Sequence, residues 1–304
     1  MDMIPSTSLT STLPAALPSS TISRMTDKPA FLVLDLESVV DGRLVQQVRF
    51  ADRPQLSPAE AVAAYRTQIS EQTGGKSDFV PGTFHLPVSV AIAKVSADFE
   101  LLDLTTIDRP KFRPQVIARK FWKGWVAHGQ PTLVTFNGRG FDLPVLELAA
   151  LRFGISVPQW FNASGSQYQQ PRNRFNTTAH LDLQDLFSNQ GAMQLNGGLN
   201  LMARLVGGAG KMHTQGDMVQ ELWERGERER IDDYCQTDVL DTYLLFLRSR
   251  VMLGLIGADR ERQLYDLARA KVEVLSTHSL ALQEYLRHMR PAAVPSDDDD
   301  VFAV

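Results

Sequence analysis

The chain has 304 residues, 43% of them hydrophobic and 22% charged, which suits one large globular domain. Its 31 basic and 35 acidic residues give a net charge of −4, and four acids form the run 297–300, without which the signs balance. Nucleic-acid binding would therefore have to rest on local patches. A single cysteine, Cys235, excludes an internal disulfide, and no stretch reaches the roughly 18 apolar residues of a membrane span. We expect a reducing, cytoplasmic compartment and no membrane partner.

The two ends of the chain differ in composition from its middle. Residues 1–23 hold ten Ser or Thr and three Pro with one charged residue, and residues 291–304 contain the acidic run. Neither end has the apolar periodicity that buries a surface. We predict a disordered Ser/Thr/Pro-rich tail at 1–28, a folded domain at 29–290 and an acidic disordered tail at 291–304.

Strand and helix patterns alternate along the first half of this domain. In chain order we predict a strand at 31–34, a helix at 58–70 capped by Ser57, strands at 86–95 and 100–104, a helix at 113–128, a strand at 131–136 and a helix at 143–153. From His180 onward the pattern is helical almost throughout, including 226–254 and 259–289. The alternation predicts an α/β fold with some parallel strand pairs, helices on the sheet and a helical C-terminal portion.

Two acidic residues follow the first predicted strand. Asp35 and Glu37 are two residues apart, so on an extended strand their side chains share a face. Adjacent carboxylates repel each other, and a bound cation removes that repulsion. Oxygen ligands of this kind suit Mg²⁺ or Mn²⁺. A solvated strand end is the alternative explanation of so short a motif.

Two later motifs also carry acids. Asp142 follows a strand and a glycine turn, where it would cap or begin a helix, but ligand sites also form at this edge of α/β sheets. Tyr234 and Asp238 are four residues apart and would share one helix face. Core packing of the phenol and a helical ion pair of the acid are the alternatives.

The three motifs form an ordered set: Asp-x-Glu, Asn-x-x-x-Phe-Asp and Tyr-x-x-x-Asp. In these motifs the chain resembles the tyrosine branch of the DEDD superfamily of 3′→5′ exonucleases. The resemblance is carried by four segments: FLVLDLESV at 31–39, LVTFNGRGFDLPVL at 133–146, HLDLQDLF at 180–187 and YCQTDVLDTYLLFLR at 234–248. The chain is most similar to predicted exonucleases related to the proofreading domain of family B DNA polymerases, over about residues 30–256. The histidine branch would place His where this chain has Asp233.

The resemblance implies a ribonuclease-H-like fold and a nuclease that releases nucleoside monophosphates from a free 3′ end. We expect single-stranded DNA as the substrate, with RNA as the alternative. The resemblance also implies two Mg²⁺ or Mn²⁺ ions bridged by Asp35. Glu37 and Asp238 would hold the ion that bears the nucleophilic water, and Asp142 would serve the second ion. Tyr234 would orient the attacking water. Two such ions can stabilise the entering and leaving oxygens of phosphoryl displacement.

Four residues are candidates for substrate binding: Asn137, Phe141, Arg172 and Arg174. Both arginines lie in the polar loop 162–178, whose mixture of aromatic and guanidinium groups is typical of single-strand binding. A merely mobile loop is the alternative. Asn137 could contact substrate, although turn formation explains it better.

Other polar groups fit structural roles better. We expect Asp182 and Asp185 to cap a helix or support the site, and 207–211 to terminate a helix rather than bind phosphate. For Asp241 we favour a surface charge over an acid that supports the site. The basic residues between 109 and 123 could follow a phosphate backbone or form the solvated face of a helix. A non-cleaving nucleic-acid-binding relative is the main alternative function, and Glu37 argues against a phosphatase of the haloacid dehalogenase type, which needs Asp there.

Overall fold

The computed structural model describes residues 28–212 and 216–291, so the two predicted tails lie almost wholly outside the described residues. Its sheet contains β1 (Phe31–Val40), β2 (His85–Val95), β3 (Leu101–Thr106), β4 (Thr132–Thr135) and β5 (His180–Asp182) in the order β3-β2-β1-β4-β5. β1 pairs antiparallel with β2 and parallel with β4, and β4 pairs parallel with β5. This mixed sheet confirms the predicted α/β class and is consistent with a ribonuclease-H-like fold.

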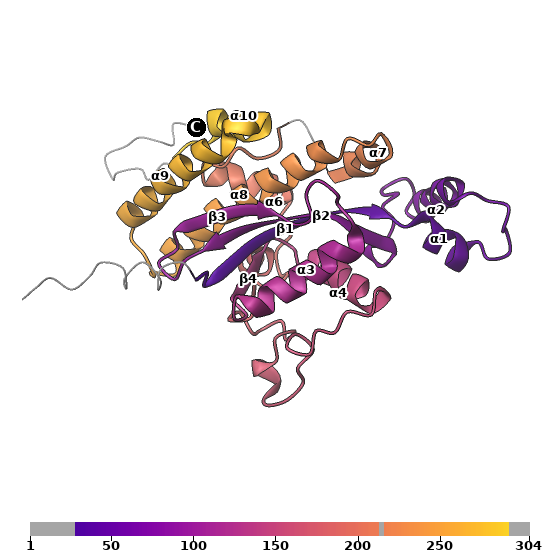
Figure 1. The fold of residues 1–304 in the computed structure, drawn as a ribbon, viewed down its shortest axis with the longest axis horizontal. Coiled ribbons are helices and arrows are strands. Elements are labelled where there is room, and N and C mark those ends of the chain that lie inside the picture. The colour runs from indigo at the N-terminus through magenta and orange to yellow at the C-terminus, as the bar shows by residue number, and fades with distance from the viewer. Residues whose placement is uncertain (1–27, 213–215, 292–304) are drawn as a thin grey trace, which may run out of the picture.

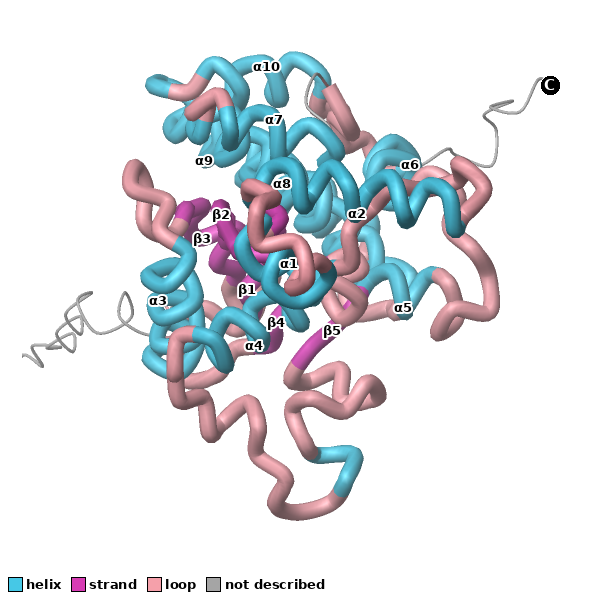
Figure 2. The backbone as a smooth tube through the Cα atoms, turned by 90° about the vertical axis from the view of Figure 1, so that its right-hand side faces the viewer, coloured by secondary structure: helices cyan, strands magenta, loops and turns pink. Residues whose placement is uncertain are grey.

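Helices cover both faces of the sheet (Figure 1). The α-helices of the described residues are α1 (Gly42–Arg49), α2 (Pro58–Gln72), α3 (Pro114–Ala127), α4 (Asp142–Arg152), α5 (Leu183–Phe187), α6 (Gly198–Leu205), α7 (Val219–Glu224), α8 (Arg228–Met252), α9 (Ala258–Leu275) and α10 (Leu280–His288). α3 and α4 lie on one side, and α8 with α6, α9 and α10 lies on the other (Figures 1 and 2). No helix of the described residues is long and apolar enough to span a membrane.

The alternation of side chains along β1 separates two cores. Leu32, Leu34 and Leu36 pack with the tryptophans of α3, whereas Val33 packs with the buried face of α8. Because side chains alternate, the odd-numbered residues that follow Val33 point toward α8. This register brings Asp35 and Glu37 to the α8 face of the sheet.

The structure corrects several predicted boundaries. β1 does not end before its acids: antiparallel pairing with β2 continues to Val40, with an irregularity between Glu37 and Ser38. α1 was not predicted, and neither was β5, whose three residues are too few to show a pattern. The helix expected at 259–289 is two helices, since Ser279 caps a new one by accepting from the N–H of Leu282.

α1 and α2 form a small lobe beyond the end of β1 (Figure 1). Ser57 caps α2 in a reciprocal box with Glu60, as its sequence predicts. Phe50 and Tyr65 fill a separate hydrophobic cluster with Val80. The segment that leaves this lobe, residues 77–84, returns along Phe141 before β2 begins.

Candidate active site

Three distant segments bring their acidic residues together. Carboxylate oxygens of Asp35 and Glu37 from β1 and of Asp238 from α8 all lie within 4.8 Å of one another. Asp142, the first residue of α4, is outside that tight group, but its charge acts on Asp35 and Glu37. Three of the four acids therefore lie together, and the fourth is near enough for its charge to act on two of them, while their catalytic and metal-binding roles stay a prediction.

Local structure explains the convergence. Asp35 and Glu37 project from one face of β1 because they are two positions apart, with one residue between them. Asp238 lies on α8, which packs against that face. Asp142 begins α4 but does not cap it, since Phe141 is the N-cap and offers no side-chain bond.

Burial and mutual repulsion raise the pKa of every member of this group. Burial, then the charge of Asp142, raises the pKa of Asp35 to about 8. Burial raises the pKa of Asp142 to about 7, with Asp182 and Asp238 adding repulsion. The pKa values of Glu37 and Asp238 lie well above their usual range, again through burial first and neighbouring carboxylates second. The four acids therefore hold more protons at neutral pH than ordinary carboxyl groups do.

One oxygen in the cluster has no partner. Oδ2 of Asp35 is buried and makes no hydrogen bond within the described residues. The backbone oxygen of Asp35 accepts a hydrogen bond from the thiol of Cys235 at 3.3 Å. A buried polar atom without a partner costs stability unless a ligand reaches it. Closely spaced carboxylate oxygens are the donors that Mg²⁺ and Mn²⁺ prefer. The residues present therefore fit a divalent cation.

Tyr234 adjoins this cluster as a hydrogen-bond donor. Burial and the charges of Asp238, Glu37 and Asp35 raise its pKa, and its phenol bonds to Asp238, which lowers the pKa of that acid. The phenol accordingly keeps its proton at any physiological pH. Tyr234 also lines a pocket of about 310 Å³ together with Gly210, Met212 and Thr237. The pocket gives this face of α8 access to solvent.

Lys211 supplies positive charge that the sequence prediction missed. Its ammonium group lowers the pKa of both Glu37 and Asp238. The turn 207–211 does terminate a helix, as predicted, since the N–H of Gly208 bonds to the oxygen of Ala203 at the end of α6. The position of Lys211 directly after a glycine-rich turn was the sequence signal that could have identified this charge. The sequence does not show, however, that the fold brings this turn beside α8.

Asp241 holds that turn in place and is not the surface charge we expected. Only 1% of it is exposed, one helical turn beyond Asp238 on α8. It accepts hydrogen bonds from the phenol of Tyr285 on α10 and from the N–H of Gly210, both at 2.8 Å. A Cβ on Gly208 would lie 2.5 Å from Oδ1 of Asp241, so only glycine allows this close approach.

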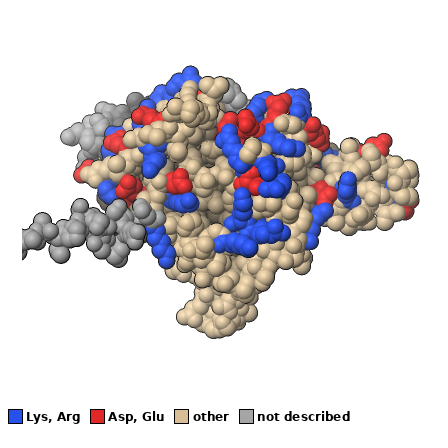
Figure 3. Space-filling model, viewed as in Figure 1, with Lys and Arg blue, Asp and Glu red and all other residues tan. Residues whose placement is uncertain are grey.

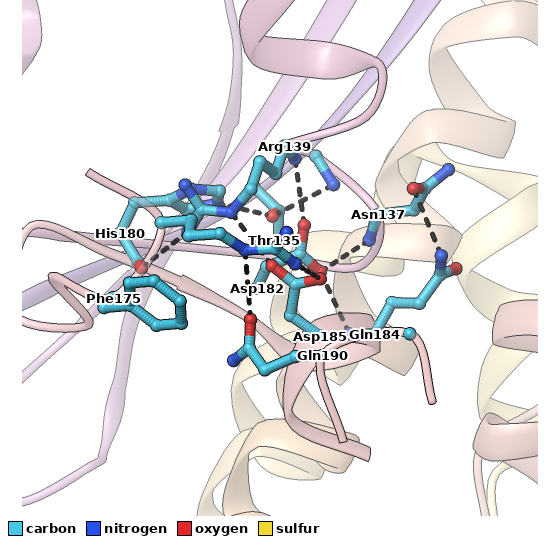
Figure 4. Close-up of polar contacts among 12 residues, drawn as sticks. Thr135, Asn137, Arg139, Phe175, His180, Asp182, Gln184, Asp185 and Gln190 are labelled. Atoms are coloured by element: carbon cyan, nitrogen blue, oxygen red, sulfur yellow. Dashed lines mark hydrogen bonds and ion pairs between the residues drawn. The ribbon is translucent and has the colours of Figure 1, made fainter. Parts of the chain in front are cut away.

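A second polar cluster shapes the turn before Asp142 (Figure 4). Asp182 accepts hydrogen bonds at 2.9 Å from the backbone N–H groups of Asn137, Arg139 and Gln184. It therefore caps α5 and supports the turn, the two roles expected for it. Asn137 adopts a left-handed φ of 63°, and its side chain accepts from Gln184, in keeping with turn formation.

The two arginines predicted to bind substrate are engaged with acids of the protein. Arg172 makes two hydrogen bonds to Glu147, at 2.8 and 2.9 Å. Arg174 contacts Asp185 at 3.3 Å, and the same acid pairs with Arg139 at 2.9 Å. Their loop extends from the edge of the molecule on the side of α4 and β5 (Figure 2). The substrate role of these arginines stays a prediction.

The basic residues between 109 and 123 lie on or near α3, whose buried face packs on the sheet opposite the acidic cluster. Figure 3 shows Lys and Arg on this side, with acidic side chains among them. Asp108 binds Arg113 at 2.9 Å and Lys120 at 3.4 Å, and Arg109 lies 3.3 Å from Asp232. These contacts fit the solvated, ion-paired face of a helix.

Sequence comparison identifies the family. The profile of a family described as predicted 3′–5′ exonucleases related to the exonuclease domain of PolB matches residues 77–289, and the chain belongs to this family. The match includes Asp142, Tyr234 and Asp238, starts after Asp35 and Glu37, and extends through α9 and α10, beyond the limit near 256 that we expected. No curated protein matches the chain significantly.

Proposed function

We propose that the protein is a metal-dependent 3′→5′ exonuclease. It hydrolyses the terminal phosphodiester bond of nucleic acid, preferentially single-stranded DNA, and releases nucleoside monophosphates. Membership of the exonuclease family supports the reaction class. The single observation that carries the metal requirement is the cluster of Asp35, Glu37 and Asp238 oxygens within 4.8 Å, with one buried oxygen unpartnered.

Each acid has a role in this proposal. Asp35 would hold two Mg²⁺ or Mn²⁺ ions, Glu37 and Asp238 would complete the first site, and Asp142 would complete the second. Two such ions supply charge stabilisation at the entering and leaving oxygens of the phosphate. The separation of Asp142 from the tight group supports its assignment to a different ion.

The remaining side chains would orient the reactants. Tyr234 keeps its proton and can donate a hydrogen bond to the attacking water while Asp238 fixes the ring. Its raised pKa supports the role of a positioning group rather than a general base. Lys211 would offset part of the negative charge of the acids, which otherwise repels an anionic substrate.

The nucleic acid would reach the site through Asn137 and Phe141, which directly precede Asp142 in the chain. Arg172 and Arg174 would contribute by exchanging Glu147 and Asp185 for phosphate groups. A cytoplasmic location is part of the proposal, supported by the single, buried thiol of Cys235.

Digestion of oligonucleotides tests this function. DNA and RNA strands labelled at the 3′ or 5′ end are incubated with the protein and Mg²⁺ or Mn²⁺, with EDTA and Asp35→Ala as controls. We expect early loss of a 3′ label, a ladder of shortened 5′-labelled strands and inhibition by EDTA. Cleavage by Asp35→Ala equal to wild type would exclude the proposed site. Binding without cleavage by the wild type would favour the non-cleaving alternative.

A further inference from the structure

Three aromatic rings meet at the start of α4, whose first residue is Asp142. Phe79, from the segment between α2 and β2, lies 5.5 Å from the ring of His85 and 6.0 Å from that of Phe141, measured between centroids. His85 and Phe141 are 5.6 Å apart and nearly perpendicular. We call Phe79, His85 and Phe141 the aromatic platform.

Hydrogen bonds fix His85 to the strand that carries Glu37. Its Nε2 lies 3.0 Å from the backbone oxygen of Val80, and its Nδ1 lies 2.8 Å from the hydroxyl of Ser38. A carbonyl oxygen only accepts, so Nε2 carries the proton and Nδ1 accepts from Ser38. Burial lowers the pKa of His85, which keeps this ring neutral. The hydrogen bond between His85 and Ser38 thereby connects the platform to the residue that follows Glu37 in β1.

Phe141 attaches the other end of the platform to Asp142. Phe141 is the N-cap of α4, directly before that acid. Gly82 lies against its ring so closely that an added Cβ would be 3.1 Å from a ring carbon. The segment 79–85 can therefore lie against Phe141 because residue 82 has no side chain. Asp142 is thus the chain neighbour of a platform residue, and Glu37 is the chain neighbour of Ser38, which is hydrogen-bonded to another.

The outer ring of the platform is left in solvent. Phe79 is 56% exposed, whereas Val80, the next residue, is 1% exposed and fills the small core of the α1–α2 lobe. Packing of the lobe accordingly depends on Val80 and leaves the ring of Phe79 available. An exposed ring that adjoins two others next to a polar site offers a surface for stacking.

We propose that the aromatic platform stacks the unpaired bases at the 3′ end of the substrate, with Phe79 as its outermost ring. The inference rests on the proposed function for the identity of the substrate. Each base has an aromatic face, so stacking tolerates any sequence. In a duplex those faces are covered by neighbouring pairs and the end must first unpair. The platform would therefore select single-stranded ends without reading their sequence.

Fluorescent oligonucleotides test the platform independently of cleavage. A ten-nucleotide thymidine strand with 2-aminopurine near its 3′ end is titrated with the full chain in Ca²⁺ and, separately, in EDTA. Stacking on the platform should quench the 2-aminopurine emission. Phe79→Ala should weaken binding about 5- to 150-fold, the range that loss of one stacked base produces, and reduce the quench. Phe79→Trp should restore both.

Leu255→Ala is the matched control, because Leu255 is also an exposed apolar residue, 57% accessible, beyond the end of α8 and outside the platform. This control variant should bind the single strand as tightly as wild type does. A blunt duplex should bind equally well to wild type and to Phe79→Ala. If Phe79→Ala leaves the affinity and the quench unchanged, the proposal that the platform stacks bases is overturned. Intact binding and quench without cleavage by the wild type would overturn the proposed function and support the platform, so the two failures are distinguishable.

Discussion

The acidic cluster at β1 and the Asp182–Asp185 cluster beside it use the same kind of side chain in opposite ways. Asp182 and Asp185 face backbone N–H groups and guanidinium groups, which supply hydrogen bonds from several directions (Figure 4). In the β1 cluster the main neighbours of a carboxylate are other carboxylates, and Oδ2 of Asp35 has no partner in the part of the chain that the structure describes. The Asp182–Asp185 cluster is complete without a ligand, and the β1 cluster is not.

The contrast also appears in the pKa values. Burial raises the pKa of Asp182, but the N–H groups of Arg139, Asn137 and Gln184 act against that rise. At Asp35 burial and Asp142 act together, and the pKa reaches about 8. An acid whose hydrogen bonds offset its burial stabilises a turn, whereas an acid left without them is prepared to bind a cation.

The largest effect we expect is loss of cleavage on Asp35→Asn. Removal of a residue that only orients a metal ligand typically lowers metal affinity or activity about 10- to 100-fold. Loss of the bridging acid should therefore lower the cleavage rate more than about 100-fold. The change also removes one member of a buried group of mutually repelling carboxyl groups and should raise the melting temperature of the metal-free protein. Single-turnover cleavage and thermal melting measure the two effects. A variant that keeps full activity would contradict the assignment of Asp35.

The next effect concerns pH and metal. Asp35 has a pKa of about 8 and Asp142 of about 7 in the folded protein, against a usual value of 3.8. Between these values the folded state holds protons that the unfolded chain has released, so metal-free stability falls as pH rises from about 4 to about 8. Mn²⁺ competes with those protons and should raise the melting temperature more at about pH 8 than at about pH 5.5. Equal shifts at both pH values would contradict a carboxylate site.

A third change addresses the complete cluster. Asp182→Ala leaves the N–H groups of Asn137, Arg139 and Gln184 without their acceptor and should lower the free energy of unfolding by about 2–3 kcal/mol. Asp185→Ala removes partly exposed ion pairs and should cost at most about 1 kcal/mol. Urea unfolding compares the two variants. Equal losses would show that the N–H bonds to Asp182 have no special weight.

The smallest effect is expected at Lys211. Lys211→Met removes the cation beside Glu37 and Asp238, and we expect about a tenfold loss or less in kcat/KM, because the side chain is exposed and screened. The loss should be greater at low salt, and Lys211→Arg should retain most of the rate. A loss that does not change with salt would argue against an electrostatic role.

The elements that carry the acids were predictable from sequence because their patterns are local. The alternation in 31–37 indicates that Asp35 and Glu37 share a face, and helical spacing indicates that Tyr234 and Asp238 share another. Their meeting was predicted through resemblance of the ordered motifs to a known superfamily. Sequence periodicity alone does not say which helix covers which face of a sheet.

The features that were missed depend on long-range contacts. Asp241 resembles a surface charge in the sequence, and only the contact with Tyr285, 44 residues away, makes it a buried acceptor. Lys211 lies far along the chain from Glu37, so its electrostatic effect exists only in the fold. β5 is three residues long and forms only because β4 offers a parallel partner.

The tie between α10 and the turn 207–211 has a practical consequence. Tyr285 reaches Gly210 through Asp241, and the N–H of Arg290 bonds to the oxygen of Gly207 at 2.8 Å. A protease cut or a fusion joint placed between α9 and α10 would spare every acid yet release the lysine-bearing turn from its anchor. Tags for purification or imaging are therefore better attached beyond residue 290.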